Sequence, residues 1–282
     1  MHKKSFPGQI QLCHLSSDPN LYYYLYLPKC MTSHPQWMVT VHGISRNARE
    51  HILYLAPYAE KMGWLLLAPL FDRRRFTDYQ RLGRRGKGER ADLKLNQILA
   101  ETGSRFDLDS NRFHLFGYSG GGQFAHRYAM AHPERILSLA VGAAGWYTFP
   151  DPEITYPRGI RPNRKLPDVD FQLECFLRIP TLVLVGEHDD RPDAELNTNP
   201  RIECQQGSSR LERGRNWILA LEKTAREYNL PSRHTFDILP GAGHSFRQCI
   251  HAGLGERLSE FLLSFSQSTP KPILNRDSLS PI

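Results

Sequence analysis

Short apolar runs alternate with amphipathic segments along most of the chain. The runs are too short for helices and end at Gly, Pro or polar residues, which is typical of buried strands; they span residues 37–42, 64–69, 112–117, 136–142, 181–186 and 234–239. The segments between them have helical periodicity, in residues 46–62, 89–100, 121–131, 214–228 and 252–265. Their apolar stripes can each cover one face of a sheet.

This alternation of strands and helices predicts the α/β class. Right-handed crossovers between successive strands build a mostly parallel central sheet with helices on both faces, and such sheets bind ligands at the carboxyl ends of their strands. Residues 20–28 alternate in polarity and stop at Pro28, which indicates an exposed antiparallel strand at the edge of the sheet.

The alternation is interrupted at residues 145–178 and 192–213, where Pro, Arg and aromatic residues replace the periodic pattern. Each interruption follows a predicted core strand, so we expect both to be short insertions over the carboxyl edge of the sheet. Because the order of elements otherwise continues, we predict a single domain over residues 1–267. The polar tail, residues 268–282, is expected to be disordered.

Composition and charge narrow the function classes. With 40% hydrophobic and 23% charged residues, the chain is expected to fold around a substantial core. Much of the formal net charge of +7 comes from an arginine-rich stretch at residues 73–90, which has neither interleaved aromatics nor a recognised motif, so no nucleic-acid partner is predicted. The longest apolar run, residues 64–71, is far shorter than the ~20 residues that span a bilayer.

The five cysteines form no recognisable motif. All five lie far apart, without a Cys-x-x-Cys pair or a histidine at zinc-ligand spacing, so no metal site is predicted. Their odd number favours reduced thiols in a cytoplasmic protein. No apolar segment of the signal-peptide kind follows the charged N-terminal residues, which fits that location, with export from a bacterium left open as the alternative.

The strongest chemical motif is Gly117-Tyr118-Ser119-Gly120-Gly121, which follows a predicted strand and precedes a predicted helix. A serine in such a strand-to-helix turn has a strained backbone and an exposed hydroxyl, and small neighbours avoid collisions with adjacent strands. The helix also aims its N-terminal N–H groups at the serine, where negative charge develops during acyl transfer. Ser119 is therefore the candidate nucleophile; the alternative is an ordinary glycine-rich turn.

With this motif in this context, residues 20–266 resemble the α/β-hydrolase superfamily. The resemblance implies a triad in the chain order serine, acid, histidine, and an oxyanion hole after the first core strand. The acid should follow the next-to-last core strand, where Asp189 has the spacing usual for the superfamily and Asp190 is its close competitor. The histidine should follow the last strand, where His244 lies in a glycine-rich loop.

An oxyanion hole needs two converging N–H donors. Gly120, which follows the nucleophile, is one candidate. Ile44 is the other, because His42-Gly43-Ile44 resembles the superfamily's His-Gly-X turn, in which glycine lets the backbone bend its next amide into the site. We interpret His42 itself as structural.

Two features of the sequence bear on which substrate the protein binds. The aromatic residues Trp146 and Tyr147, with Phe149 and Tyr156, could line an apolar pocket, or could pack the first insertion onto the domain. Arg73 follows a core strand at the carboxyl edge and could bind a substrate carboxylate or phosphate through paired hydrogen bonds; the alternative is a solvated loop.

The order of elements, ending in Gly-Ala-Gly-His-Ser-Phe, is similar to bacterial carboxylesterases and to esterases of the polyhydroxyalkanoate-depolymerase-like group, which implies a small-molecule ester as substrate. We expect a serine hydrolase that forms a covalent acyl-enzyme on Ser119 and requires no cofactor. A peptidase, amidase or thioesterase is the first alternative, and for a peptidase or amidase Glu153, Asp168 or Glu195 could anchor the substrate's amino terminus. A protein that binds a ligand without catalysis is the second.

Overall fold

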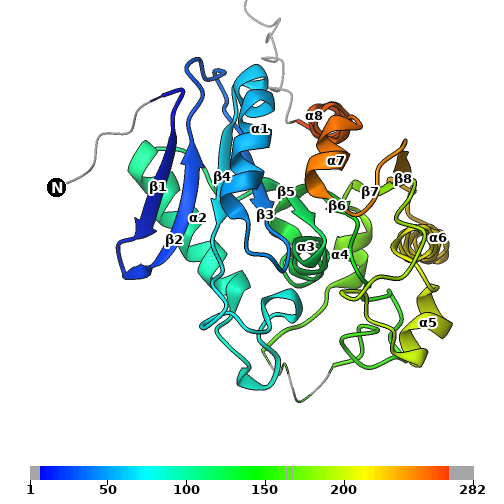
Figure 1. The fold of residues 1–282 in the computed structure, drawn as a ribbon. Helices are drawn as coiled ribbons and strands as arrows, with labels where there is room; N and C mark the ends of the chain where they lie inside the picture. The colour runs from blue at the N-terminus through cyan, green and yellow to red at the C-terminus, as the bar shows by residue number, and fades with distance from the viewer. Residues whose placement is uncertain (1–6, 163, 165, 167, 267–282) are drawn as a thin grey trace, which may run out of the picture.

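The computed structural model, which describes residues 7–162, 164, 166 and 168–266, is built around one eight-stranded sheet (Figure 1). Its strands lie in the order β1-β2-β4-β3-β5-β6-β7-β8; β1 and β2 are antiparallel to their neighbours, and all pairs from β4 to β8 are parallel. The strands are β1 Ile10–Leu15, β2 Asp18–Tyr26, β3 Trp37–Val41, β4 Leu65–Pro69, β5 Phe113–Tyr118, β6 Ile136–Gly142, β7 Thr181–Gly186 and β8 His234–Leu239.

Helices cover both faces of this sheet. On one face α1 packs against α8, and on the other α4 contacts both α3 and α6. The helices are α1 Ala48–Met62, α2 Ala91–Phe106, α3 Gly120–Ala131, α4 Leu173–Leu177, α5 Pro200–Gln206, α6 Arg210–Glu227, α7 Phe246–His251 and α8 Leu254–Ser264, with short 3₁₀ helices at Tyr79–Arg81, Arg84–Gly86 and Pro133–Arg135. The predicted α/β class with a mostly parallel sheet is confirmed. Within the described residues, no helix is both long and apolar enough for a membrane crossing.

Burial explains why the core strands appear as continuous apolar runs. Every residue of β3, β4, β5 and β7 is buried, because helices cover the sheet on both sides. In β2, by contrast, Leu21 and Tyr23 are buried while Tyr22 between them is exposed. The polarity of β2 therefore alternates, as expected for a strand with one face in the core.

The edge of the sheet differs from the prediction. The strand expected at residues 20–28 is β2, but β1 pairs with its outer side, so β2 is an inner strand. Because β1 lies at the margin of the core, Leu12 remains 52% exposed and the strand shows no clear period in its sequence. The prediction of a disordered tail at residues 268–282 falls outside the described residues.

Two helical segments differ from those that the periodicity predicted. α6 begins at Arg210 rather than at residue 214, because the Ser209 side chain accepts a hydrogen bond from the Glu212 N–H and caps the helix. The segment predicted at residues 252–265 is α8, and a separate short helix, α7, precedes it directly after the His244 loop.

Most of the described arginines in the arginine-rich stretch are held in ion pairs. One of these contacts joins the loop after β4 to β2, and the others hold the loop together and connect its end to the first turn of α2. The pairs are Arg75 with Asp18 and Glu89, Arg81 and Arg84 with Asp78, and Arg90 with Asp92.

We expect Asp18→Asn to lower the free energy of unfolding at neutral pH by about 1 kcal/mol, because it weakens a partly buried, bidentate ion pair. Hydrogen bonds from Arg75 lower the pKa of Asp18 to about 2, against the effect of burial and with help from Lys94. A depressed folded-state pKa contributes stability above the unfolded value of about 3.9, and that contribution is lost as the pH falls towards 2. Urea unfolding should show the difference between variant and wild type shrinking across this range; a difference independent of pH would contradict the assignment.

Candidate active site

Ser119 lies in the tight turn between β5 and α3. Its backbone has φ 54° and ψ −114°, a combination that residues other than glycine rarely adopt. The Ser119 N–H donates to the Gly142 carbonyl of β6 at 2.7 Å, and its carbonyl accepts from the Gln123 N–H of α3 at 3.1 Å. The turn thus has the geometry of a nucleophile elbow, which presents the hydroxyl above the carboxyl end of the sheet.

Gly117 and Gly121 are required by the close approach of main chains at this turn. A Cβ at Gly117 would lie 2.1 Å from the Gly121 carbonyl oxygen, and one at Gly121 would lie 1.9 Å from the Val41 carbonyl oxygen in β3. Both obstacles are backbone atoms, so no side-chain rotation could relieve the collision. The spacing of glycines in the motif therefore has a direct steric cause.

Gly121→Ala is accordingly expected to lower the free energy of unfolding by about 3 kcal/mol, the upper end of ordinary overpacking effects. Gly145→Ala is the matched control, because a Cβ there would meet only the Gln123 side-chain amide, at 3.2 Å. Chemical unfolding followed by circular dichroism measures both variants. Equal stabilities for the two would show that the elbow tolerates a side chain at residue 121.

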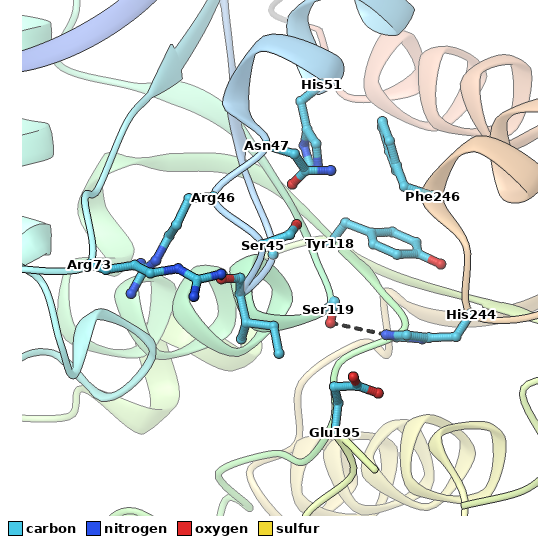
Figure 2. Close-up of a pocket in the computed structure, with 12 residues that line it drawn as sticks. Ser45, Arg46, Asn47, His51, Arg73, Tyr118, Ser119, Glu195, His244 and Phe246 are labelled. Carbon is cyan, nitrogen blue, oxygen red and sulfur yellow. Dashed lines mark hydrogen bonds between the residues drawn. The ribbon is translucent and has the colours of Figure 1, made fainter. Parts of the chain in front are cut away.

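The loops after β7 and β8 bring Asp189 and His244 to the nucleophile. The His244 Nδ1 lies 2.7 Å from Asp189 Oδ2. On the other side of the ring, the Ser119 Oγ lies 3.1 Å from His244 Nε2, the contact drawn as a dashed line in Figure 2. A carboxylate only accepts hydrogen bonds, so Nδ1 carries the proton and Nε2 is free to accept from the serine hydroxyl. Asp189 is 3% exposed, whereas Asp190 is exposed. The structure therefore places Asp189, and not its neighbour, behind the histidine.

Arg210, the first residue of α6, contacts the same carboxylate from the other side and was missed by sequence reasoning. Its Nη1 donates to Asp189 Oδ1 at 3.1 Å and to Asp193 Oδ2 at 2.7 Å. Burial disfavours the charged form of Arg210, but the hydrogen bond to Asp193 and the charges of both carboxylates outweigh it and raise the pKa of Arg210. With one oxygen on His244 and the other on Arg210, the Asp189 carboxylate is held in a single orientation.

The two candidate oxyanion donors, Ile44 and Gly120, lie close together beside the nucleophile. A Cβ built on Gly120 would lie 2.9 Å from Ile44 Cγ2, and one built on Gly43 would lie 3.4 Å from Ser119 Cβ. Both candidates thus belong to one closely packed corner of the site, formed by the loop after β3 and the first residue of α3.

His42 holds the first of these loops from the interior. Its Nδ1 donates to the Gly43 carbonyl at 2.9 Å, and its Nε2 accepts from the Phe71 N–H at 3.0 Å. Burial lowers the pKa of His42 to about 4, so the ring is neutral at pH 7, as one donated and one accepted bond require. Because the peptide after Gly43 is trans, tying its carbonyl to His42 turns the Ile44 N–H to the opposite side.

A cavity of about 580 Å³ opens beside Ser119 and His244. Three of the side chains that line it are charged, namely Arg46, Arg73 and Glu195, and Figure 2 shows both arginines on one side of Ser119 with His244 on the other. Arg73 and Glu195 were among the sequence candidates, whereas Arg46 was not, because no motif distinguishes it. The lining also includes Ile44, Ser45, Asn47, His51, Tyr118 and Phe246. In the described part of the chain, no three His, Cys, Asp or Glu side chains converge as a metal site would require.

Trp146 and Tyr147 lie in the interior rather than on this cavity, which corrects the expectation that they line a substrate pocket. Trp146 is 5% exposed and packs on the Arg127 guanidinium, whose carbon is 4.4 Å from the ring centroid. Tyr147 is fully buried and stacks on Trp217 of α6, with 4.7 Å between ring centroids. Apolar ring surfaces facing α3 and α6 stabilise the first insertion by burial, so these aromatics attach it to the domain.

No protein-family model and no curated protein matches the sequence. Solved structures do match. The chain is similar to poly(aspartic acid) hydrolase-1 from Sphingomonas sp. KT-1, with 24% identity and a TM-score of 0.74 over 89% of this chain and 98% of that chain. It is similar to a poly(3-hydroxybutyrate) depolymerase from Bordetella parapertussis, with 24% identity and a TM-score of 0.72 over 94% and 92% of the two chains. A fluorophosphonate-binding serine hydrolase from Staphylococcus aureus matches at 13% identity, with a TM-score of 0.59 over 91% and 99%. Together with the strand order, these likenesses show the α/β-hydrolase fold.

Proposed function

We propose that this α/β-hydrolase-fold protein is a serine hydrolase that cleaves carboxylic esters through a covalent acyl-enzyme. The observation that carries the proposal is the hydrogen-bonded chain from Ser119 through His244 to Asp189, beside a cavity at the carboxyl edge of the sheet. The poly(3-hydroxybutyrate) depolymerase and the fluorophosphonate-binding serine hydrolase of the same fold support it.

In the first half of the proposed reaction, Ser119 Oγ attacks the ester carbonyl carbon while its proton passes to His244 Nε2. Asp189 keeps the proton on Nδ1 and stabilises the resulting imidazolium. The N–H groups of Ile44 and Gly120 bind the oxyanion of the tetrahedral intermediate. The bond from the carbonyl carbon to the alcohol oxygen then breaks, and His244 gives its proton to the leaving alkoxide.

In the second half, water attacks the acyl carbon and His244 Nε2 takes a proton from it. The intermediate collapses with cleavage of the bond to Ser119 Oγ, which receives that proton back from the imidazolium. The carboxylic acid leaves, and the hydroxyl and the neutral histidine are restored. Water is the only co-reactant, and no cofactor takes part in either half.

Labelling with a fluorophosphonate probe tests this proposal, combined with peptide mass mapping and turnover of p-nitrophenyl acetate and butyrate. We expect an adduct on Ser119, none in Ser119→Ala, and hydrolysis of at least one ester. Ser45→Ala is the matched control, because Ser45 lines the same cavity and should leave labelling unchanged. Absence of both adduct and turnover in the wild-type protein would overturn the proposal in favour of a ligand-binding protein.

Glu195 supports one alternative, an amidase or peptidase with the same triad. Glu195 lines the cavity, where its carboxylate would attract a substrate amine, whereas the other two sequence candidates, Glu153 and Asp168, are not part of the lining. This alternative predicts that an aminoacyl p-nitroanilide is cleaved with a higher kcat/KM than the p-nitrophenyl ester of a simple fatty acid. It also predicts that Glu195→Gln lowers turnover of the anilide while sparing the ester.

A further inference from the structure

Arg46 and Arg73 enter the cavity from different loops, after β3 and β4, and neither has an ion-pair partner among the described residues. Nearby arginines of the same stretch, such as Arg75 and Arg84, are bound to carboxylates. Charged side chains that face a cavity beside a nucleophile without a partner of opposite charge are available to a ligand.

Arg46 has unused hydrogen-bond donors. Its Nη2 donates to the Phe76 carbonyl at 3.1 Å, and its guanidinium carbon lies 4.1 Å from the centroid of the Tyr79 ring, so the group is fixed in place. Its Nε and Nη1 are buried and have no hydrogen-bond partner. These two N–H groups are closed off from solvent, so the positive charge of Arg46 is little compensated within the protein, and a ligand reaches the part of the side chain that lines the cavity.

Arg73 is exposed and extends over the loop that carries the oxyanion candidate, where its Nη2 lies 3.5 Å from the Ile44 carbonyl oxygen. Arg73 and Arg46 lie close enough for their charges to interact: burial lowers the pKa of Arg46 and the positive charge of Arg73 lowers it further, against the opposite effects of Tyr79 and Asp72. Two like charges held together in this way are stabilised when an anion lies between them.

The first turn of α1 borders the same side of the cavity. Asn47, the N-cap of this 15-residue helix, lines the cavity, and its side-chain amide donates to Glu50 in the first turn instead of capping the helix. Because the Glu50 carboxylate opposes the positive end of the helix dipole, the positive charge on this side comes from the two guanidinium groups. Glu195 is the one acidic side chain in the lining, and Figure 2 shows it below Ser119 and away from both arginines.

We propose that the substrate carries a second, anionic group, a carboxylate or a phosphate, which Arg46 and Arg73 bind while the scissile carbonyl lies at Ser119. Guanidinium groups present parallel N–H donors that match the paired oxygens of both anions. The proposal rests on the ester hydrolysis proposed above and narrows its substrates to acidic esters, such as half esters of dicarboxylic acids. It assigns a specificity role to these arginines and no chemical step.

The test compares acidic esters with amides of the same shape that lack the charge. Monoethyl adipate and its amide, ethyl adipamate, place the group on the acyl side, whereas 4-acetoxybenzoate and 4-acetoxybenzamide place it on the leaving side. The acetyl ester of 4-hydroxyphenyl phosphate tests a phosphate in place of the carboxylate. We expect the wild-type protein to hydrolyse an acidic ester with a higher kcat/KM than its neutral counterpart. Arg73→Gln should lower the kcat/KM of the acidic ester by about 10- to 100-fold, which is the range for loss of a hydrogen bond to a charged group. Turnover of the neutral counterpart should change less than about twofold, since it makes no charged contact.

Arg74→Gln is the control, because Arg74 is exposed, adjacent in sequence and not part of the lining. Arg73→Glu, also at an exposed position, should reverse the preference, and Arg46→Gln should act in the same direction as Arg73→Gln. Equal kcat/KM for charged and neutral esters in the wild-type protein, or equal losses in Arg73→Gln, would overturn the inference. That failure is distinct from failure of the proposed function, in which the wild-type protein would neither be labelled on Ser119 nor hydrolyse p-nitrophenyl butyrate.

Discussion

Ser119→Ala should reduce kcat for p-nitrophenyl butyrate by about 10⁴-fold or more, because removal of the nucleophile leaves only binding and the oxyanion donors. The substitution deletes a single oxygen whose one side-chain hydrogen bond among the described residues is with His244 at 3.1 Å, and alanine can retain the same turn between β5 and α3. Steady-state kinetics measures the loss, and circular dichroism verifies that the fold is retained. A reduction smaller than tenfold would show that the attacking group lies elsewhere.

A double variant tests the role of Ser119 without relying on the size of the activity loss in a single variant. In the proposed mechanism the serine and the histidine act as one unit, so Ser119→Ala combined with His244→Ala is expected to be about as slow as Ser119→Ala alone. If the two losses multiplied, Ser119 and His244 would be acting independently. The hydrogen bond between them would then not be part of the reaction.

Asp189→Asn should lower kcat by about 10⁴-fold through the wrong histidine tautomer. Arg210 Nη1 donates to Asp189 Oδ1, so an asparagine at this position must turn its carbonyl oxygen towards the arginine. Its NH₂ group then faces His244 Nδ1, which becomes the acceptor and moves the ring proton to Nε2. The histidine can no longer accept the proton of the Ser119 hydroxyl. Kinetics measures the loss, and nitrogen NMR of the imidazole reports the tautomer directly.

Asp190→Asn is the matched control for this prediction. Asp190 is the neighbouring carboxylate and is exposed, so its replacement should leave both the tautomer and kcat within about twofold of wild type, as is usual for exposed sites. The reverse outcome, with Asp190→Asn inactive and Asp189→Asn active, would exchange the two assignments. It would also remove the reason for Arg210 to lie against the triad acid.

The sequence by itself determined the features that depend on neighbours along the chain. Strands buried on both faces must be short apolar runs, so the positions of β3 to β7 were visible in the order of residues. β8 lies at the end of the sheet and is partly exposed, but it too was visible as a short run that ends at a proline and a glycine. The turn at Ser119 requires a strand, small residues and a helix start within a few positions, and all three are present in the motif. His244 was identified because it occupies the loop after the last strand, which is again a local property.

Only the tertiary structure decided which distant side chains meet. Asp189 and Asp190 are adjacent in sequence, but one is buried behind the histidine and the other is exposed, a choice made by packing against α6. Arg46 and Arg73 come from loops after different strands and converge because those strands are neighbours in the sheet. Periodicity states which face of an element is apolar but not what that face contacts. For the same reason it could not tell that Trp146 and Tyr147 pack against α3 and α6 and lie away from the cavity.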